Sequence, residues 1–271
     1  MEKNKMNLHT KKTGMIVLTI FVFMLYFFMY LPVLSLLANS CNSSTMASIW
    51  EGFTLKWYAQ IISSSEVRYA FFNSIFIAVC STILSVLLGT MLVLGTIKNK
   101  KTSLDALFYP NIFTPDIVLA LAILNIFKFL EIPCGFVSLI IGHTAIGLIF
   151  VIPLIKTKLN ELDSSLIEAS LDLGANYWYT TKKILLPLLK PAILTASLMT
   201  FTLSLDDFFI SFFCAGPEIQ TLSLYVFSRL RTQSSPSLSA LSTIMILISF
   251  LALFVSYKIV RKTSRENTPN A

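Results

Sequence analysis

The chain has 271 residues, of which 55% are hydrophobic and only 13% are charged. One aqueous core cannot bury so much apolar surface, so most of the chain must face lipid or other helices. The net charge of +7 does not indicate nucleic-acid binding, because 16 of the 21 lysines and arginines fall in segments predicted to be cytoplasmic or, for Lys258, at the cytoplasmic end of the last span. Retention of positive residues on that side of a membrane explains the asymmetry.

The first predicted elements are a tail, a membrane span and an outer loop. Residues 1–13 carry four lysines and are predicted to be a cytoplasmic tail. The apolar run over 14–38 is longer than the roughly 7–15 residues of a signal-peptide core, so we expect a retained membrane helix. Residues 39–68 form a polar outer loop with Trp50, Trp57 and Tyr58, which are residue types that favour the membrane interface.

Five further apolar segments are long enough to cross a bilayer. They are 69–97, 106–129, 136–155, 191–213 and 238–260, and two of them contain internal prolines. The loop 156–190 and the tail 261–271 are predicted to be cytoplasmic. The sequence therefore predicts an all-α integral membrane protein with six transmembrane helices over 14–260 and both termini in the cytoplasm.

The loop 156–190 is too long and too patterned to be a simple connector. Asp163 and Ser164 offer an N-cap to a helical run that carries Glu168, and Gly174 can adopt the left-handed conformation that ends a helix. A second helical piece, about 177–185, would lead to Pro187. We expect a short helix–turn–helix at the membrane face.

This loop resembles the EAA motif of bacterial ABC-importer permeases, EAA-x3-G-x9-I-x-L-P. The matching residues, with every spacing kept, are Glu168, Ala169, Ser170, Gly174, Ile184, Leu186 and Pro187. Ser170 replaces the second alanine, and this small-for-small change leaves a docking role in place. The resemblance implies the type I ABC-importer permease fold, with this loop as the coupling helix that docks on an ATP-binding subunit.

Other segments resemble spermidine/putrescine permeases of the C type. The strings lie at 52–58, 73–74, 115–118 and 201–217. The resemblance implies polyamine import by alternating access in the bacterial inner membrane. It also implies a second, B-type permease subunit, two ATP-binding subunits and an extracytoplasmic substrate-binding protein as partners.

Asp206 and Asp207 are the strongest chemical anomaly in the sequence. They lie deep in the fifth predicted span, where a carboxylate costs about 2.5–3.5 kcal/mol at the membrane centre. They are candidates for a substrate pathway that attracts a polycation, together with Asp116 in the third span. The alternatives are a helix–helix hydrogen bond or an N-cap at a break for the pair, and a kinked helix start after Pro115 for Asp116.

The sequence lacks motifs for nucleotide binding, catalysis and metal binding. There is no GxxxxGK[ST] phosphate loop, so we expect no cofactor on this chain and ATP use by a partner. No nucleophile–base or metal-ligand pattern appears, which disfavours an enzyme. Cys41, Cys134 and Cys214 are predicted on the outer side, which allows a disulfide.

Two alternative functions stay open at this point. The same architecture could carry another solute, such as an iron complex, an anion or thiamine. An ion-driven secondary transporter would need no ATPase, and the coupling loop would then be unexplained.

Overall fold

The computed structural model describes residues 2–45, 49–98, 108–232 and 236–266. These residues are largely helical, and their one extended pairing is an isolated antiparallel bridge between Asn42 and Phe53. The elements are α1 (Glu2–Ser40), α2 (Lys56–Ser63), α3 (Ser65–Lys98), η1 (Pro110–Phe113), α5 (Asp116–Phe129), α6 (Phe136–Glu161), α7 (Ser165–Asp172), α8 (Tyr177–Thr180), η2 (Thr181–Leu185), α9 (Leu186–Asp206), α10 (Phe209–Cys214), α11 (Leu222–Thr232) and α12 (Pro236–Glu266). The predicted all-α class is confirmed for these described ranges.

Four helical stretches are long and apolar enough to cross a membrane. They are Gly14–Ser40, Ser65–Ile97, Phe136–Glu161 and Tyr177–Asp206. At 1.5 Å per residue, each exceeds the roughly 30 Å of a hydrocarbon core. A shorter apolar stretch, Pro236–Leu251, opens α12, which occupies the sixth predicted span.

The third predicted span, 106–129, is not one helix. Residues 106 and 107 lie outside the described residues. The chain then forms the 3₁₀ turn η1, passes through extended Thr114 and Pro115, and begins α5 at Asp116. Pro115 disfavours helical backbone at the residue before it, which is why the helix starts only after the proline.

The fifth predicted span, 191–213, is also interrupted. Its helix begins earlier, at Leu186, and ends at Asp206. Asp207 has extended backbone, with φ −64° and ψ 127°, and the short helix α10 follows from Phe209. The helix is therefore not continuous across this predicted span, and the break falls at the aspartate pair.

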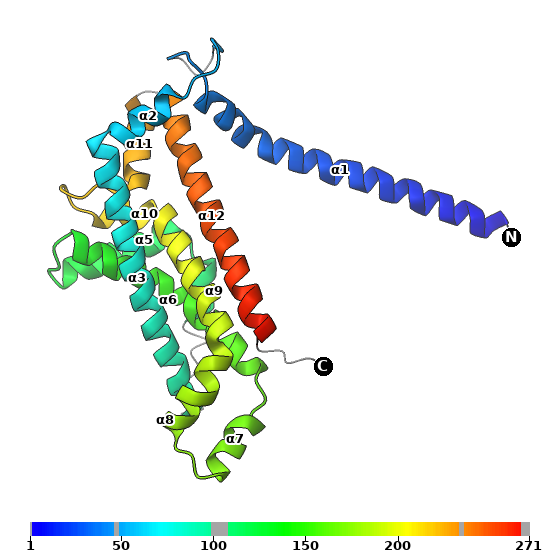
Figure 1. The fold of residues 1–271 in the computed structure, drawn as a ribbon, viewed down its shortest axis with the longest axis vertical. Coiled ribbons are helices and arrows are strands. Elements are labelled where there is room, and N and C mark those ends of the chain that lie inside the picture. The colour runs from blue at the N-terminus through cyan, green and yellow to red at the C-terminus, as the bar shows by residue number, and fades with distance from the viewer. Residues whose placement is uncertain (1, 46–48, 99–107, 233–235, 267–271) are drawn as a thin grey trace. The chain divides into compact units, whose positions relative to one another are not determined.

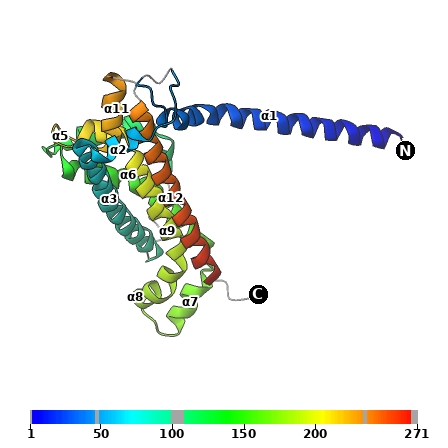
Figure 2. The ribbon, with the colours of Figure 1, turned by 45° about the horizontal axis from the view of Figure 1, so that its top comes forward.

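The chain divides into two compact units, each described here by itself. The first comprises 1–62 and 232–245, and the second comprises 63–231 and 246–271. In the second unit α3, α6 and α9 pack side by side, with α5 against α10 and with α7 and α8 near the start of α9 (Figures 1 and 2).

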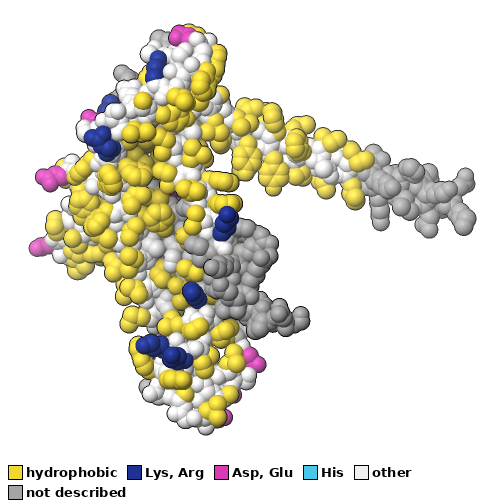
Figure 3. Space-filling view, in the orientation of Figure 1, with side chains coloured by type: hydrophobic (Ala, Val, Ile, Leu, Met, Phe, Trp, Pro, Cys, Tyr) yellow, Lys and Arg dark blue, Asp and Glu magenta, His cyan; other side chains and the backbone are white. Residues whose placement is uncertain are grey.

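Two apolar clusters hold the second unit together. One contains Ile77, Leu139 and Ile210, together with Phe127 of α5. The other contains buried aliphatic residues of α3, α6 and α9, among them Val93, Val151, Ile152 and Leu189. Hydrophobic side chains also cover much of the visible flank of α3 and α9, and charged ones are scattered between them, several of them near α7 and α8 (Figure 3). This distribution suits helices whose flanks face lipid.

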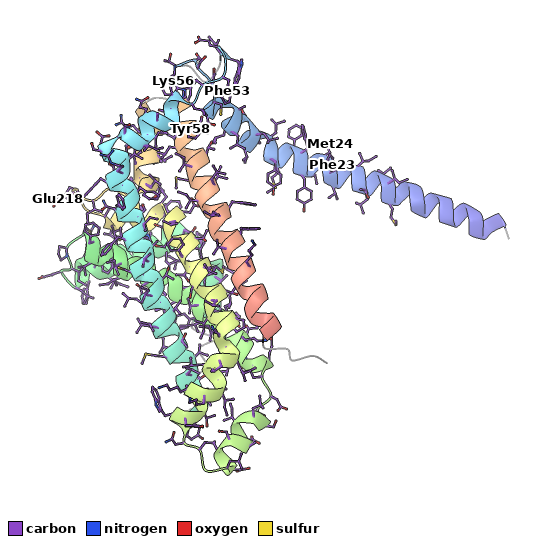
Figure 4. The ribbon with its side chains drawn as sticks, viewed as in Figure 1. Phe23, Met24, Phe53, Lys56, Tyr58 and Glu218 are labelled. Atoms are coloured by element: carbon purple, nitrogen blue, oxygen red, sulfur yellow. The ribbon has the colours of Figure 1, made fainter. Side chains whose placement is uncertain are left out.

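The segment between α1 and α2, in the first unit, is organised around Asn42. Its Oδ1 accepts hydrogen bonds from the backbone N–H groups of Ser44 and Glu51, at 3.1 Å each. The indole N–H of Trp57 donates to Asn42 O at 2.6 Å, and Tyr58 OH lies 2.7 Å from Ser40 Oγ. Figure 4 shows Tyr58 beside Lys56 on α2. Trp57 is buried, so within this unit it acts as a loop anchor rather than the exposed interface residue expected from sequence.

Candidate functional site

The break between α9 and α10 places the side chain of Asp207 inside the helix bundle. Its Oδ2 accepts a hydrogen bond from Ser211 N at 3.1 Å, so the carboxylate caps the start of α10. Its backbone carbonyl accepts from Ser223 Oγ at 2.6 Å. Backbone groups at a helix break need such partners when water is excluded. The N-cap position of α10 is Phe208, so Asp207 lies one residue before it and still accepts from a backbone N–H of the first turn.

A cavity of about 210 Å³ opens beside this break, within the second unit. Its walls come from α5, α6, α9, α10 and the break itself. The lining residues are Asp116, His143, Ile146, Gly147, Phe150, Thr200, Leu203, Ser204, Asp206, Asp207, Phe208 and Phe209.

All three aspartates that the sequence singled out line this one cavity. Asp116 begins α5, Asp206 is the last residue of α9 and Asp207 follows it. Asp116 and Asp206 are exposed, whereas the side chain of Asp207 is 14% exposed. The structure therefore brings together carboxylates that are 90 positions apart in the sequence.

Sequence reasoning missed His143, which lies on α6 next to Asp207. Its Nε2 is 3.5 Å from Asp207 Oδ2, and its side chain is 3% exposed. Its Nδ1 is 2.8 Å from Leu139 O. A single histidine in an apolar helix reads as a packing residue, but an ionisable group inside a membrane span is itself a signal of function.

Close packing of α3, α6 and α9 forms the inner wall of the cavity. A Cβ on Gly147 would lie 2.7 Å from Thr200 Cγ2 and would also collide with Ser85 Oγ, so only glycine allows this approach. Ser85 Oγ donates to Thr144 O at 3.1 Å, and Ser81 Oγ lies 3.2 Å from Ser204 Oγ. These hydroxyls join α3 to α6 and α9, which are two of the helices that line the cavity.

The predicted helix–turn–helix is present in the loop between α6 and α9. Asp163 Oδ1 accepts from Ser165 N at 2.9 Å, and this hydrogen bond lowers the pKa of the exposed Asp163 carboxyl. At the other end of α7, Gly174 has φ +85°. Its N–H bonds to Leu171 O at 2.9 Å, while Ala175 N bonds to Ser170 O at 3.1 Å. This pair of bonds is the Schellman ending that a glycine permits.

Ser170 joins the two helical pieces of the loop. It is buried, and its hydroxyl lies 2.9 Å from the hydroxyl of Thr180 on α8. Asn176 caps α8, because its Oδ1 accepts from Tyr179 N at 2.8 Å. The position where the sequence departs from the EAA pattern therefore carries a contact that alanine cannot make.

The far end of the motif lies in a helix rather than in the turn. Ile184 belongs to the π-helical turn η2, and Leu186 and Pro187 begin α9. The π turn includes the bond from Leu186 N to Thr181 O. A proline ring clashes with the carbonyl four residues before it in an α-helix, and a wider π turn relieves this clash.

The outer face of this loop exposes apolar and acidic side chains together. Glu168 and Ala169 are exposed, Leu173 is 89% exposed and Trp178 is 73% exposed. Large apolar side chains gathered on a polar end of a protein mark an interaction surface.

The two residues of the sequence string 73–74 have structural roles in the second unit. Asn73 Nδ2 donates to Gln220 O at 3.0 Å, and Ser74 Oγ accepts from Leu222 N at 2.8 Å. Both contacts hold the segment before α11 against α3.

The four cysteines are all free, so the disulfide that the sequence allowed is not formed.

The fold is that of the membrane-spanning subunits of ABC importers. It superimposes on a chain of a bacterial ABC transporter that imports the acidic polysaccharide alginate, with a TM-score of 0.69 at 16% identity. That match covers 93% of this chain and 97% of the other.

The chain belongs to the family of binding-protein-dependent transport system inner membrane components, whose pattern matches residues 85–265. It is 33% identical over 251 residues to the spermidine/putrescine transport system permease protein PotC of Escherichia coli K12, covering 92% of this chain and 95% of that protein. It is 29% identical over 253 residues to the putrescine transport system permease protein PotI of the same organism, covering 88% and 90%.

Proposed function

We propose that this chain is the permease subunit of an ATP-driven importer whose cargo is a polyamine, spermidine or putrescine. The cargo crosses the inner membrane by alternating access. The complex contains a second, B-type permease subunit, two ATP-binding subunits and an extracytoplasmic binding protein that delivers the cargo. The relatives with polyamine names and the family's dependence on a binding protein support this assembly.

One observation carries the choice of cargo: Asp116, Asp206 and Asp207 line a single cavity. Carboxylates in a medium of low dielectric attract cations much more strongly than they do in water. Phe150, Phe208 and Phe209 line the same cavity and offer ring faces to an ammonium group. A polyamine is a flexible methylene chain with charged amines at intervals. It therefore matches both the carboxylates and the aromatic side chains that line the cavity.

The exposed loop supplies the connection to ATP. We assign α7, with Glu168, Ala169 and Ser170, as the coupling helix that docks on the ATP-binding subunit. Gly174 turns the chain, and Ile184, Leu186 and Pro187 connect the loop to α9. Because α9 leads directly to the aspartate pair, a movement of the loop is transmitted along one helix to the cavity.

This chain binds no cofactor in the proposed mechanism. ATP is bound and hydrolysed by the partner subunits, and closure of those subunits moves α7. The transport energy therefore reaches the cavity through protein contacts alone.

The proposal is tested by uptake in cells that lack this gene and carry it on a plasmid. Labelled spermidine and putrescine should enter, and Asp206→Asn with Asp207→Asn should reduce entry at least tenfold at equal membrane abundance. Uptake of an iron chelate, an anion or thiamine with no polyamine uptake would assign a different cargo to the same architecture.

A further inference from the structure

His143 has no part in the proposed function, yet its Nε2 lies 3.5 Å from the carboxylate of Asp207. We propose that His143 is the resident counter-ion of Asp207 in the empty cavity, and that an ammonium group of the cargo displaces the hydrogen held between them. This inference rests on the proposed polyamine cargo. His143 would thus be a positioning residue that sets how tightly the cavity holds a cation.

The hydrogen bonds of His143 fix which ring nitrogen faces the aspartate. Leu139 O can only accept, so the Nδ1 atom 2.8 Å away must carry a hydrogen. The other nitrogen, Nε2, then faces Asp207 Oδ2 at 3.5 Å. Without a hydrogen between them, Nε2 of His143 and Oδ2 of Asp207 are two acceptors that repel each other. One shared hydrogen makes the contact favourable and leaves this pair of residues with no net charge.

Two groups contact the Oδ2 atom of Asp207, and the same residue also lines the cavity. Ser211 N donates to Oδ2 at 3.1 Å, and His143 approaches the same oxygen from α6. Among the residues that line the cavity, His143 is the one that can carry positive charge. The other titratable groups near the pair are Asp116 and Asp206 in the cavity and the thiol of Cys214 on α10.

The exchange balances in atoms and charge. The neutral pair with one hydrogen meets a primary ammonium group, the hydrogen leaves to water as a proton, and the pair keeps one negative charge. The ammonium group then rests on Asp207, while neutral His143 retains its bond to Leu139. An empty cavity therefore holds no uncompensated carboxylate at Asp207, and an occupied cavity holds the cation instead of the proton.

This exchange implies that protons and the cargo compete for Asp207. For the complete transporter, the KM for spermidine should rise as the external pH falls, because protons then compete with the cargo for the pair formed by Asp207 and His143. One released proton gives at most about a tenfold rise in KM per pH unit. The maximal rate at saturating spermidine should change much less.

His143→Gln removes the titrating ring and keeps an amide that donates to the carboxylate. Wild type, His143→Gln and His143→Asn are compared in the same assay, so that pH effects from the other aspartates, the binding protein and the ATPase are common to all. We expect the KM to depend on pH at least threefold less steeply in both variants. Asp207→Asn should lose the same pH dependence, which provides a second route if the histidine variants assemble poorly.

Equal pH profiles of KM in wild type and His143→Gln would overturn the inference and leave the proposed function intact. A wild-type transporter that takes up no spermidine at any pH would instead overturn the proposed function. A pH effect confined to the maximal rate would also contradict displacement of a proton by the cargo.

Discussion

The hydroxyl of Ser170 lies 2.9 Å from that of Thr180, and this buried contact ties α7 to α8. Ser170→Ala should destabilise the loop by about 0.5–1.5 kcal/mol, the usual net value of a hydrogen bond. Ser170→Val should cost more, because the extra methyl groups must fit a buried site. Hydrogen exchange of the amides over 165–180 measures both, and equal exchange in wild type and Ser170→Ala would show that the contact contributes nothing.

The side chain of Glu168 is exposed on the first turn of α7, where a partner subunit can reach it. Glu168→Lys should therefore abolish uptake and cargo-stimulated ATP hydrolysis while the protein remains in the membrane. The matched control is Glu218→Lys, the same charge change in the segment between α10 and α11 (Figure 4), which should keep both activities. Normal uptake by Glu168→Lys would remove this residue from the coupling surface.

Gly174 is required for its backbone and not for its size. Its φ is +85°, and a Cβ added there would meet nothing within 4 Å. Gly174→Ala should cost about 1–2 kcal/mol through left-handed strain, and Gly174→Asn should cost less because asparagine tolerates this region. Uptake should fall in the same order, from wild type through Gly174→Asn to Gly174→Ala. If all three transport equally, the turn is not limiting for coupling.

Gly147 is required for its size and not for its backbone, because its backbone is helical and neighbouring side chains leave no room for a Cβ. Gly147→Ala should push Thr200 and Ser85 apart and cost about 1–3 kcal/mol by overpacking. The control is Gly95→Ala in α3, where a Cβ meets nothing within 4 Å and added helix propensity should stabilise slightly. Thermal unfolding of the purified complex compares the two, and an unchanged midpoint for Gly147→Ala would contradict the packing described.

The sequence predicted the helical elements well, for physical reasons. Apolar runs of sufficient length must form helices in a bilayer, so the stretches over α1, α3 and α6 follow from hydropathy alone. The helix–turn–helix between α6 and α9 was predictable because Gly174 signals a helix ending directly. Pro115 likewise marked the start of α5.

The break at Asp207 was harder to predict, because neither proline nor glycine lies beside it in the sequence. It is stabilised by Ser211 and Ser223, which only the folded chain brings to the aspartate. The partnership of His143 with Asp207 depends on the packing of α6 against α10, and hydropathy carries no information on helix neighbours.

The central claim is that ATP drives a polyamine through a cavity lined by Asp116, Asp206 and Asp207. Its most direct test is uptake of labelled spermidine by proteoliposomes that contain the complete transporter and its binding protein, with ATP supplied to the side of the ATP-binding subunits. We predict uptake that requires ATP and that falls at least tenfold in Asp207→Asn, with basal ATP hydrolysis retained. Uptake that proceeds without ATP, or that is unchanged when Asp206 and Asp207 are both replaced by asparagine, would contradict the account.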